Sequence, residues 1–282
     1  NIMFPFLNPR LRILLINKRT IFEPPRSGYP VVYDKPPENL RFLARFRRAC
    51  QEWKSEWNLY IQEFKAKLTL NPKCFVQNED DIIWKFDGTK KSLDQWIVNS
   101  DQDYSHGYST AKLELSSHGT GIFHGILDTR VPKDGRTVRS GYCNITSVRK
   151  CKSFKRKILL DWTNYNELVL RIRGDGRCYM LNLLCGQYFD ITRNYAFHYV
   201  MYTRGGPHWQ VVRIPFAKFL FASKGVIDDM QFPLTSHCIK NFGITLADKK
   251  PGPFKLEIDH ISICMNSNLF ETFAYEMYDI HK

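Results

Sequence analysis

Two short strings combine residue types that could do chemistry. The first, from Arg173 to Arg177, reads Arg-Gly-Asp-Gly-Arg and places one carboxylate between two guanidinium groups. Asp-Gly between two alternating segments is a strong hairpin signal, so we interpret this string as a tight turn with charged flanks. The predicted turn consists of Gly174, Asp175, Gly176 and Arg177.

The second string is Ser100-Asp101-Gln102-Asp103, in which two carboxylates alternate. Alternating Asp residues suit a calcium loop, but the Gly and the distal Glu of such a loop are missing. An Asx-type turn, in which the carboxylates accept backbone N–H groups, is the preferred interpretation. A structural calcium ion of the kind found in sugar-binding jelly rolls remains an alternative.

The remaining sequence contains no recognisable catalytic motif. The nucleophile elbow, the phosphate-binding loop and the dinucleotide fingerprint are all absent, and the eight His residues show no metal-ligand spacing. The eight Cys residues include no pair two residues apart, so we interpret them as mostly free, buried thiols in a reducing compartment. We therefore assign no catalytic residue, no metal ligand and no cofactor.

Residues 76–282 are expected to form the domain that positions these strings. Apolar and polar residues alternate around Leu113, Leu170 and Leu256, which is the pattern of a strand with one face in a core. Nine or more such strands without a convincing helix between them predict an all-β sandwich or jelly roll. Further strands are expected at 121–127, 141–145, 178–183, 197–201, 211–214 and 242–246.

One irregularity in this alternation is specific enough to test. Ile258 and Ile261 are three residues apart, although a regular strand would place core residues two or four apart. One extra residue would restore both side chains to the core. We therefore predict a β-bulge at Asp259 or His260.

Residues 1–75 are expected to form a basic N-terminal extension. They contain 14 Lys or Arg against 6 Asp or Glu. Their acid-free start, 1–22, resembles the end of a mitochondrial transit peptide, and we expect the true start of the protein to be missing because residue 1 is Asn. The Pro-rich segment 23–37 predicts a linker, and 38–70 predicts one long amphipathic helix.

The apolar face of this helix is the candidate binding surface. Its apolar residues recur in steps of three and four, so they share one face that must be covered. It could pack on its own sandwich, dock on another protein or lie in a membrane interface. The candidate partner-binding residues are Arg41, Arg45, Phe46, Trp53, Trp57, Tyr60 and Phe64.

The charge of the whole chain favours anionic partners. The formal net charge is +13, and more than half of the surplus lies in residues 1–75. An acidic protein face or a negatively charged membrane fits this distribution. The basic residues of the helix are not interleaved with strand aromatics, so we do not expect nucleic-acid binding.

Six strings, in their order and spacing, resemble the complex I intermediate-associated protein family. The resemblance covers about residues 82–265. One departure is His106, where the family often has Gly. The strings lie at 100–109, 121–125, 139–142, 170–179, 209–216 and 242–258.

The resemblance implies a galactose-binding-like jelly roll and no enzymatic activity. It also implies an assembly factor in the mitochondrial matrix that binds a membrane-arm intermediate of NADH:ubiquinone oxidoreductase together with other assembly factors. The basic amphipathic extension independently suits peripheral attachment to the inner membrane. The alternative function is a sugar-binding protein similar to carbohydrate-binding modules, because a fold does not by itself carry a function.

Overall fold

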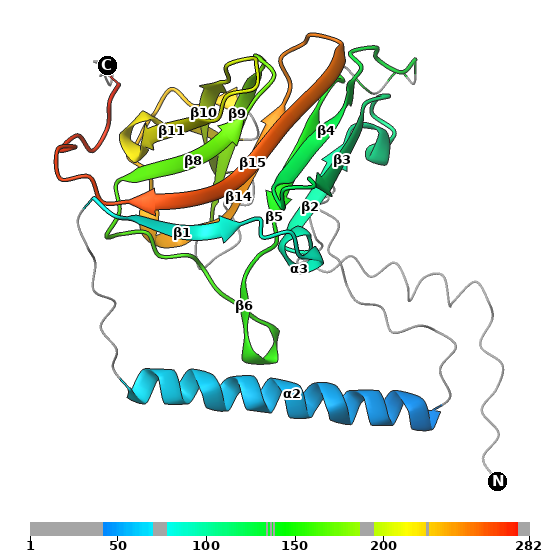
Figure 1. Ribbon diagram of the computed structural model, residues 1–282, viewed down its shortest axis with the longest axis vertical. Coiled ribbons are helices and arrows are strands. Elements are labelled where there is room, and N and C mark those ends of the chain that lie inside the picture. Colours follow the sequence, from blue (N-terminus) through cyan, green and yellow to red (C-terminus); the bar gives the residue numbers. More distant parts are fainter. Residues whose placement is uncertain are drawn as a thin grey trace. The chain divides into compact units, whose positions relative to one another are not determined.

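The protein is a β-sandwich preceded by a long helix, as seen in a computed structural model (Figure 1). The structure describes residues 42–69, 78–133, 135, 137, 139–186, 195–223 and 226–275. Residues 1–50 and 51–282 separate into two compact units, and each is considered by itself. All strand pairings among the described residues are antiparallel.

The first sheet, sheet A, has the order β11-β8-β15-β4-β3, and β1 pairs with the far end of β15. Strand β15 is long enough to pair with β4 along its first half and with β1 along its second half. Sheet A consists of β1 (Asp80–Lys85), β3 (Thr110–Leu115), β4 (Gly121–Leu127), β8 (Glu167–Arg173), β11 (Gln210–Pro215) and β15 (Gly252–Cys264).

The second sheet, sheet B, has the order β13-β12-β10-β9-β14-β5-β2. The chain passes repeatedly between the two sheets, as from β4 to β5, from β8 to β9 and from β14 to β15, which gives the jelly-roll type of sandwich. Sheet B consists of β2 (Trp96–Ser100), β5 (Cys143–Ser147), β9 (Cys178–Cys185), β10 (Tyr195–Tyr202), β12 (Leu220–Ser223), β13 (Val226–Ile227) and β14 (Ile239–Leu246).

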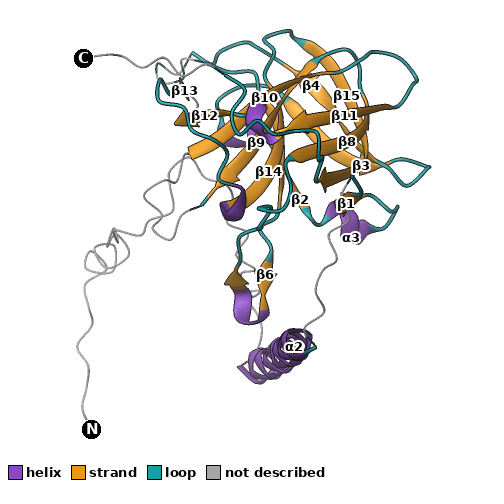
Figure 2. Cartoon of the chain, turned by 90° about the vertical axis from the view of Figure 1, so that its left-hand side faces the viewer, coloured by secondary structure: helices purple, strands orange, loops and turns teal. Residues whose placement is uncertain are grey.

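A small hairpin projects from the sandwich in both overall views (Figures 1 and 2). It is formed by β6 (Cys151–Lys152) and β7 (Arg156–Lys157), joined by a 3₁₀ turn, η2 (Ser153–Lys155). The short elements elsewhere are α3 (Lys90–Leu93), η1 (Gln102–Tyr104), η4 (Phe216–Lys218) and η5 (Ser236–Cys238).

The core lies between the inner faces of the two sheets. Phe123 and Leu256 from sheet A meet Leu181 and Phe242 from sheet B, and all four side chains are fully buried. The core cluster extends from Trp84 to Ile263 and includes none of the described helix residues before it. The expected all-β sandwich is thus confirmed, and every strand predicted from alternation is present.

The predicted β-bulge is also confirmed. The register of β15 against β8 shifts between Ile258 and His260, so that Asp259 is the extra residue. Both Ile258 and Ile261 are fully buried as a result.

Three predictions need correction. Trp96, Trp162 and Trp209 stand at the ends of predicted strands, which predicts that all three are core residues. Trp96 and Trp162 are buried, but Trp209 is only half-buried, and its ring packs on Arg171 and Arg173 rather than in the core. Every described Cys is free, but only Cys143 and Cys264 are buried; Cys50 and Cys151 are exposed and the other three are intermediate. Strands β1, β2, β6, β7, β12 and β13 were not predicted.

The long helix is α2 (Phe42–Leu68), with 27 residues. The predicted helix, 38–70, therefore agrees with the structure over its described part, and residues 38–41 and 70 lie outside it. No described helix is long and apolar enough to cross a membrane.

Candidate functional site

The apolar face of α2 is exposed. The five predicted aromatic residues have exposed fractions between 40% and 64%, whereas the only half-buried side chains described after Cys50 in this helix are Glu56 and Glu63. This pattern is the reverse of an ordinary amphipathic helix, which buries its apolar face. The exposed aromatic residues are Phe46, Trp53, Trp57, Tyr60 and Phe64; Arg41 and the side chain of Arg45 lie outside the described part.

The two glutamates are half-buried because they bind the η2 turn of the hairpin. Glu63 accepts hydrogen bonds from the Ser153 N–H at 2.7 Å and from the Ser153 hydroxyl at 3.1 Å. Glu56 accepts the N–H of Phe154 at 2.6 Å. The free N–H groups of a tight turn are thereby satisfied by two carboxylates that are seven residues apart on one helix face.

Charge reinforces this contact. Arg156 Nη2 lies 2.7 Å from Glu63 Oε2 and also donates to the Ser153 hydroxyl. The hydrogen bond from the Ser153 N–H lowers the pKa of Glu63, and the Arg156 guanidinium lowers it further. Glu63 is therefore ionised at neutral pH and holds the hairpin through its charged form.

An aromatic contact completes the junction. Phe154 adopts a left-handed backbone with φ 58°, which a non-Gly residue adopts only when its surroundings enforce it. Its ring centroid lies 6.1 Å from that of Trp57 and 6.0 Å from that of Tyr60. The aromatic row of α2 thus gains one further ring from the hairpin, and Phe154 itself remains 42% exposed.

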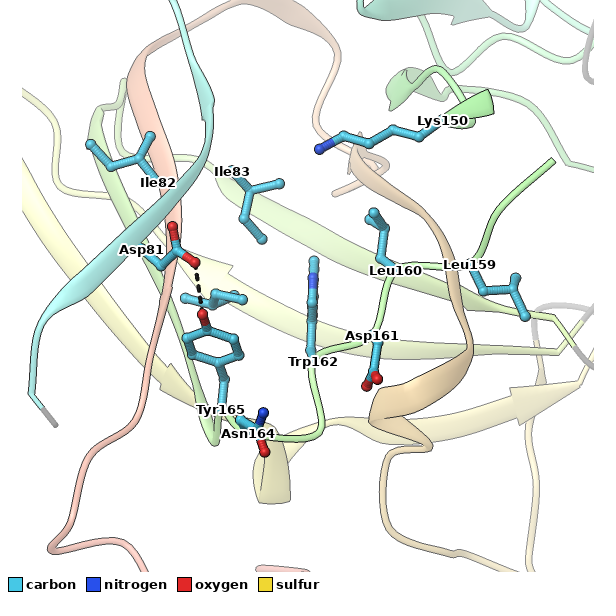
Figure 3. Close-up of a pocket in the computed structure, with 11 residues that line it drawn as sticks. Asp81, Ile82, Ile83, Lys150, Leu159, Leu160, Asp161, Trp162, Asn164 and Tyr165 are labelled. Carbon is cyan, nitrogen blue, oxygen red and sulfur yellow. Dashed lines mark hydrogen bonds between the residues drawn. The ribbon is translucent and has the colours of Figure 1, made fainter. Parts of the chain in front are cut away.

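A pocket of about 360 Å³ lies at the base of the hairpin (Figure 3). One wall is β1 with Asp81 and Ile83, and the other is the segment that follows β7, with Leu160 and Trp162. Asp81 accepts the Tyr165 hydroxyl at 2.7 Å, and burial together with this carboxylate raises the pKa of Tyr165 to about 12. Trp162 is 2% exposed, so its ring does not offer a stacking platform for a sugar.

Residues 174–177 connect β8 of sheet A to β9 of sheet B, so they carry the chain from one sheet to the other and do not form the hairpin that the Asp-Gly signal indicated. Gly176 has φ 88°, and a Cβ at Gly174 would lie 2.3 Å from the Cβ of Thr203. Asp175 accepts the N–H groups of Arg177 and Lys255. Both glycines are thus required at these positions, and the aspartate joins the turn to the start of β15.

Arg177 connects this turn to the loop before β15. Its guanidinium binds Asp248 in a bidentate manner, at 2.9 and 2.7 Å, and donates to the carbonyl groups of Lys250, Gly252 and Pro253. Burial acts to raise the pKa of Asp248, but the hydrogen bonds from Arg177 and from the Lys250 N–H lower it overall. The charged string therefore fastens two loops together and does not form a catalytic pair.

Asp101 and Asp103 use their carboxylates for backbone contacts. Asp101 is fully buried and accepts the N–H groups of Ser109 and Gly141, both at 2.7 Å. Asp103 accepts the N–H of Ser100, also at 2.7 Å. The partners of Asp101 are 8 and 40 positions further along the chain, so these contacts tie separate loops together and are not the local Asx turn that was predicted. No cluster of metal-ligating side chains is present among the described residues.

The hairpin that contacts α2 was not predicted from the sequence. Residues 149–157 contain six Lys or Arg and no acid, and this run was the available signal. Its contacts with Glu56 and Glu63 join residues about 90 positions apart in the chain, which no local pattern can predict.

Comparison with solved structures finds sandwich domains of low sequence identity. A family 11 carbohydrate-binding module from Clostridium thermocellum, solved with a mixed-linked tetrasaccharide, matches with a TM-score of 0.45 and 14% identity. The match covers 68% of this chain and 98% of the module.

Comparison with known sequences finds much closer relatives. "Complex I intermediate-associated protein 30, mitochondrial" of Drosophila melanogaster is 42% identical over 91% of this chain and 86% of its own length. The protein of the same name from Mus musculus is 41% identical over 71% of this chain, which spans only 61% of the mouse protein. The sequence model described as "Complex I intermediate-associated protein 30 (CIA30)" matches residues 84–258, which is most of the sandwich. This chain therefore belongs to the complex I intermediate-associated protein 30 family.

Proposed function

We propose that this protein is a non-enzymatic assembly factor of mitochondrial respiratory complex I. It binds a membrane-arm intermediate together with other assembly factors, on the matrix side of the inner membrane and in peripheral contact with it. Its relatives are named mitochondrial complex I intermediate-associated proteins, which supports the assembly role and the compartment. The names of the relatives specify neither a membrane-arm intermediate nor the matrix nor a membrane contact, and these three details belong to our proposal.

The observation that carries this proposal is the exposed aromatic row of α2. Burial of a large apolar side chain contributes about 1.5–3 kcal/mol, and Trp53, Trp57 and Phe64 keep 64%, 46% and 54% of their surfaces exposed. A contiguous apolar row of this kind marks an interaction site on a soluble protein. Trp and Tyr are also the residues that most often supply binding energy at protein interfaces.

Complexome profiling of mitochondria tests the proposal. The wild-type protein should migrate with partial complex I and not with the mature enzyme. The double variant Trp53→Asp/Trp57→Asp should lose this co-migration because two aromatic contacts are replaced by charges. Tyr202→Asp/Phe270→Asp is the matched control, because it changes two other exposed aromatic residues. Migration of the wild type only as a free monomer, or unchanged migration of the helix variant, would contradict the proposal.

The sugar-binding alternative has no specific support in the described residues. It would need exposed aromatic platforms in a groove, and the tryptophan of the pocket at the hairpin base is buried. A glycan array decides between the two functions: selective binding of one class of glycan would favour the alternative.

A further inference from the structure

The hairpin concentrates positive charge on one short element. Residues 149–157 contain six Lys or Arg and no acid. Lys152 and Lys157 are exposed and form no ion pair with any described residue. A cluster of this density is not needed for the fold of the hairpin, which rests on the β6–β7 pairing and on the contacts of its turn with Glu56 and Glu63.

The hairpin charges lie next to the aromatic row. Phe154, at the tip of the hairpin, packs against Trp57 and Tyr60, and the Arg156 guanidinium lies 5.9 Å from the centroid of the Tyr60 ring. The glutamates that face the hairpin, Glu56 and Glu63, are both occupied by it. On this flank the charge of Glu63 is paired with Arg156, and the Glu56 carboxylate is bound by the Phe154 N–H group.

The opposite flank of the row is also basic. Successive helix residues are separated by about 100° around the axis. Glu56 and Glu63 each precede an aromatic residue of the row by one position, whereas Lys54 and Lys65 each follow one, so the lysines lie on the other side. Both lysines are exposed. The row is thus bordered by cations on both flanks.

We propose that this basic–aromatic surface binds the headgroup layer of an anionic lipid bilayer. It consists of Trp53, Lys54, Trp57, Tyr60, Phe64, Lys65, Lys152, Phe154 and Lys157. The aromatic rings enter the interface, and the lysine ammonium groups contact lipid phosphates. This inference rests on the proposed function and deepens it by naming the ligand of the helix surface and the hairpin as its second half.

Three features favour lipid over an acidic protein face. Trp and Tyr have an apolar body and a polar tip, which suits the boundary between acyl chains and headgroups. The row from Trp53 to Phe64 follows one straight helix for about 16 Å, which suits a flat surface. The exposed cations without ion pairs are lysines, which contact phosphates as point charges and do not require the fixed geometry of a protein carboxylate.

Vesicle flotation of the purified full-length chain tests this inference. The probes are phosphatidylcholine vesicles and the same vesicles containing roughly 20 mol% phosphatidylglycerol. The wild type should bind the anionic vesicles, should not bind the neutral ones, and should be released by added salt. The fluorescence of the exposed Trp53 and Trp57 should shift to shorter wavelength on binding, and Trp53→Phe/Trp57→Phe should lose this shift.

Charge variants test the role of the hairpin. Lys152→Ala/Lys157→Ala should weaken binding by about 25-fold, since each lysine near an anionic surface contributes about fivefold. Lys90→Ala/Lys91→Ala is the control, because it removes two exposed lysines of α3 and should leave binding unchanged. Equal melting temperatures exclude unfolding as the cause.

Equal binding to neutral and anionic vesicles, or equal loss in both lysine variants, would overturn the inference. Absence of vesicle binding with retained co-migration with partial complex I would also overturn it. In that case the surface binds a protein, and the proposed assembly function stands.

Discussion

Neutralising Asp248 should destabilise the sandwich strongly, because its carboxylate is the charged partner of Arg177. Their side chains are only 8% and 12% exposed, so solvent screens this pair weakly. Asp248→Asn keeps the shape of the side chain but removes the charge and one acceptor. The guanidinium would keep the carbonyl groups of Gly252 and Pro253 as acceptors.

The expected magnitude follows from these remaining contacts. Removal of one partner of a buried ion pair costs about 3–5 kcal/mol, and the retained carbonyl acceptors reduce the loss for Asp248→Asn to about 2–3 kcal/mol. Arg177→Met should cost about 3–5 kcal/mol, because it leaves a buried carboxylate without its cation. The double variant should lose less than the sum of the two, since both charges are then absent.

Urea denaturation followed by tryptophan fluorescence measures these losses. With a slope of about 2 kcal/mol per molar urea, Asp248→Asn should lower the midpoint by about 1–1.5 M. The pKa of Asp248 is lowered in the folded protein, so the pair stabilises the fold above the unfolded pKa of about 3.9. This contribution is lost as the pH falls through the folded pKa. A midpoint unchanged by the substitution, or a difference that stays constant from pH 7 to pH 3, would refute the reasoning.

Three further predictions concern the turn, the domain boundary and the hairpin. Gly176→Ala should cost about 1 kcal/mol in denaturation because its φ is 88°, whereas Gly205→Ala, without a left-handed backbone, should cost less than about 0.5 kcal/mol. Residues 76–282 alone should melt as cooperatively as the full chain in calorimetry, since the core cluster contains no helix residue; aggregation or a broad transition would contradict this. Hydrogen exchange at the Ser153 amide should be faster in Glu63→Gln than in the wild type. In the wild type, the protection of this amide should also fall at pH below the lowered pKa of Glu63. Equal protection of the Ser153 amide in the variant and the wild type would contradict the contact.

Alternation in the sequence predicted the sandwich because each long strand has one face in the core. Strand β4 was predicted at its observed bounds, and the break in alternation near Asp259 predicted the bulge. Strands β6, β7 and β13 have only two residues each, which is too short for alternation to show. Trp209 was misassigned because its ring packs on outward-facing arginines, and an aromatic residue in a sequence does not reveal which face of the sheet it covers.

The site was predictable only in part, for a different physical reason. Periodicity identified the aromatic row of α2, because that pattern lies within one helix. It could not show that Glu56 and Glu63 hold a hairpin about 90 residues further along, since that contact depends on the folded sandwich presenting the η2 turn. The predicted boundary at residue 75, between the basic extension and the sandwich domain, remains a proposal.

The reversed burial along α2 constrains how this helix can be stabilised. Isolated helices are marginal in water, and most helices in proteins gain their stability by packing an apolar face. Here the described contacts of the hairpin engage two carboxylates and the edges of Trp57 and Tyr60, while Trp53 and Phe64 stay more than half exposed. The hairpin can therefore orient the helix, but it cannot supply the apolar burial that the row offers. None of the residues that the structure describes supplies that burial, so binding of a partner should increase the hydrogen-exchange protection of the α2 backbone amides as well as cover its rings.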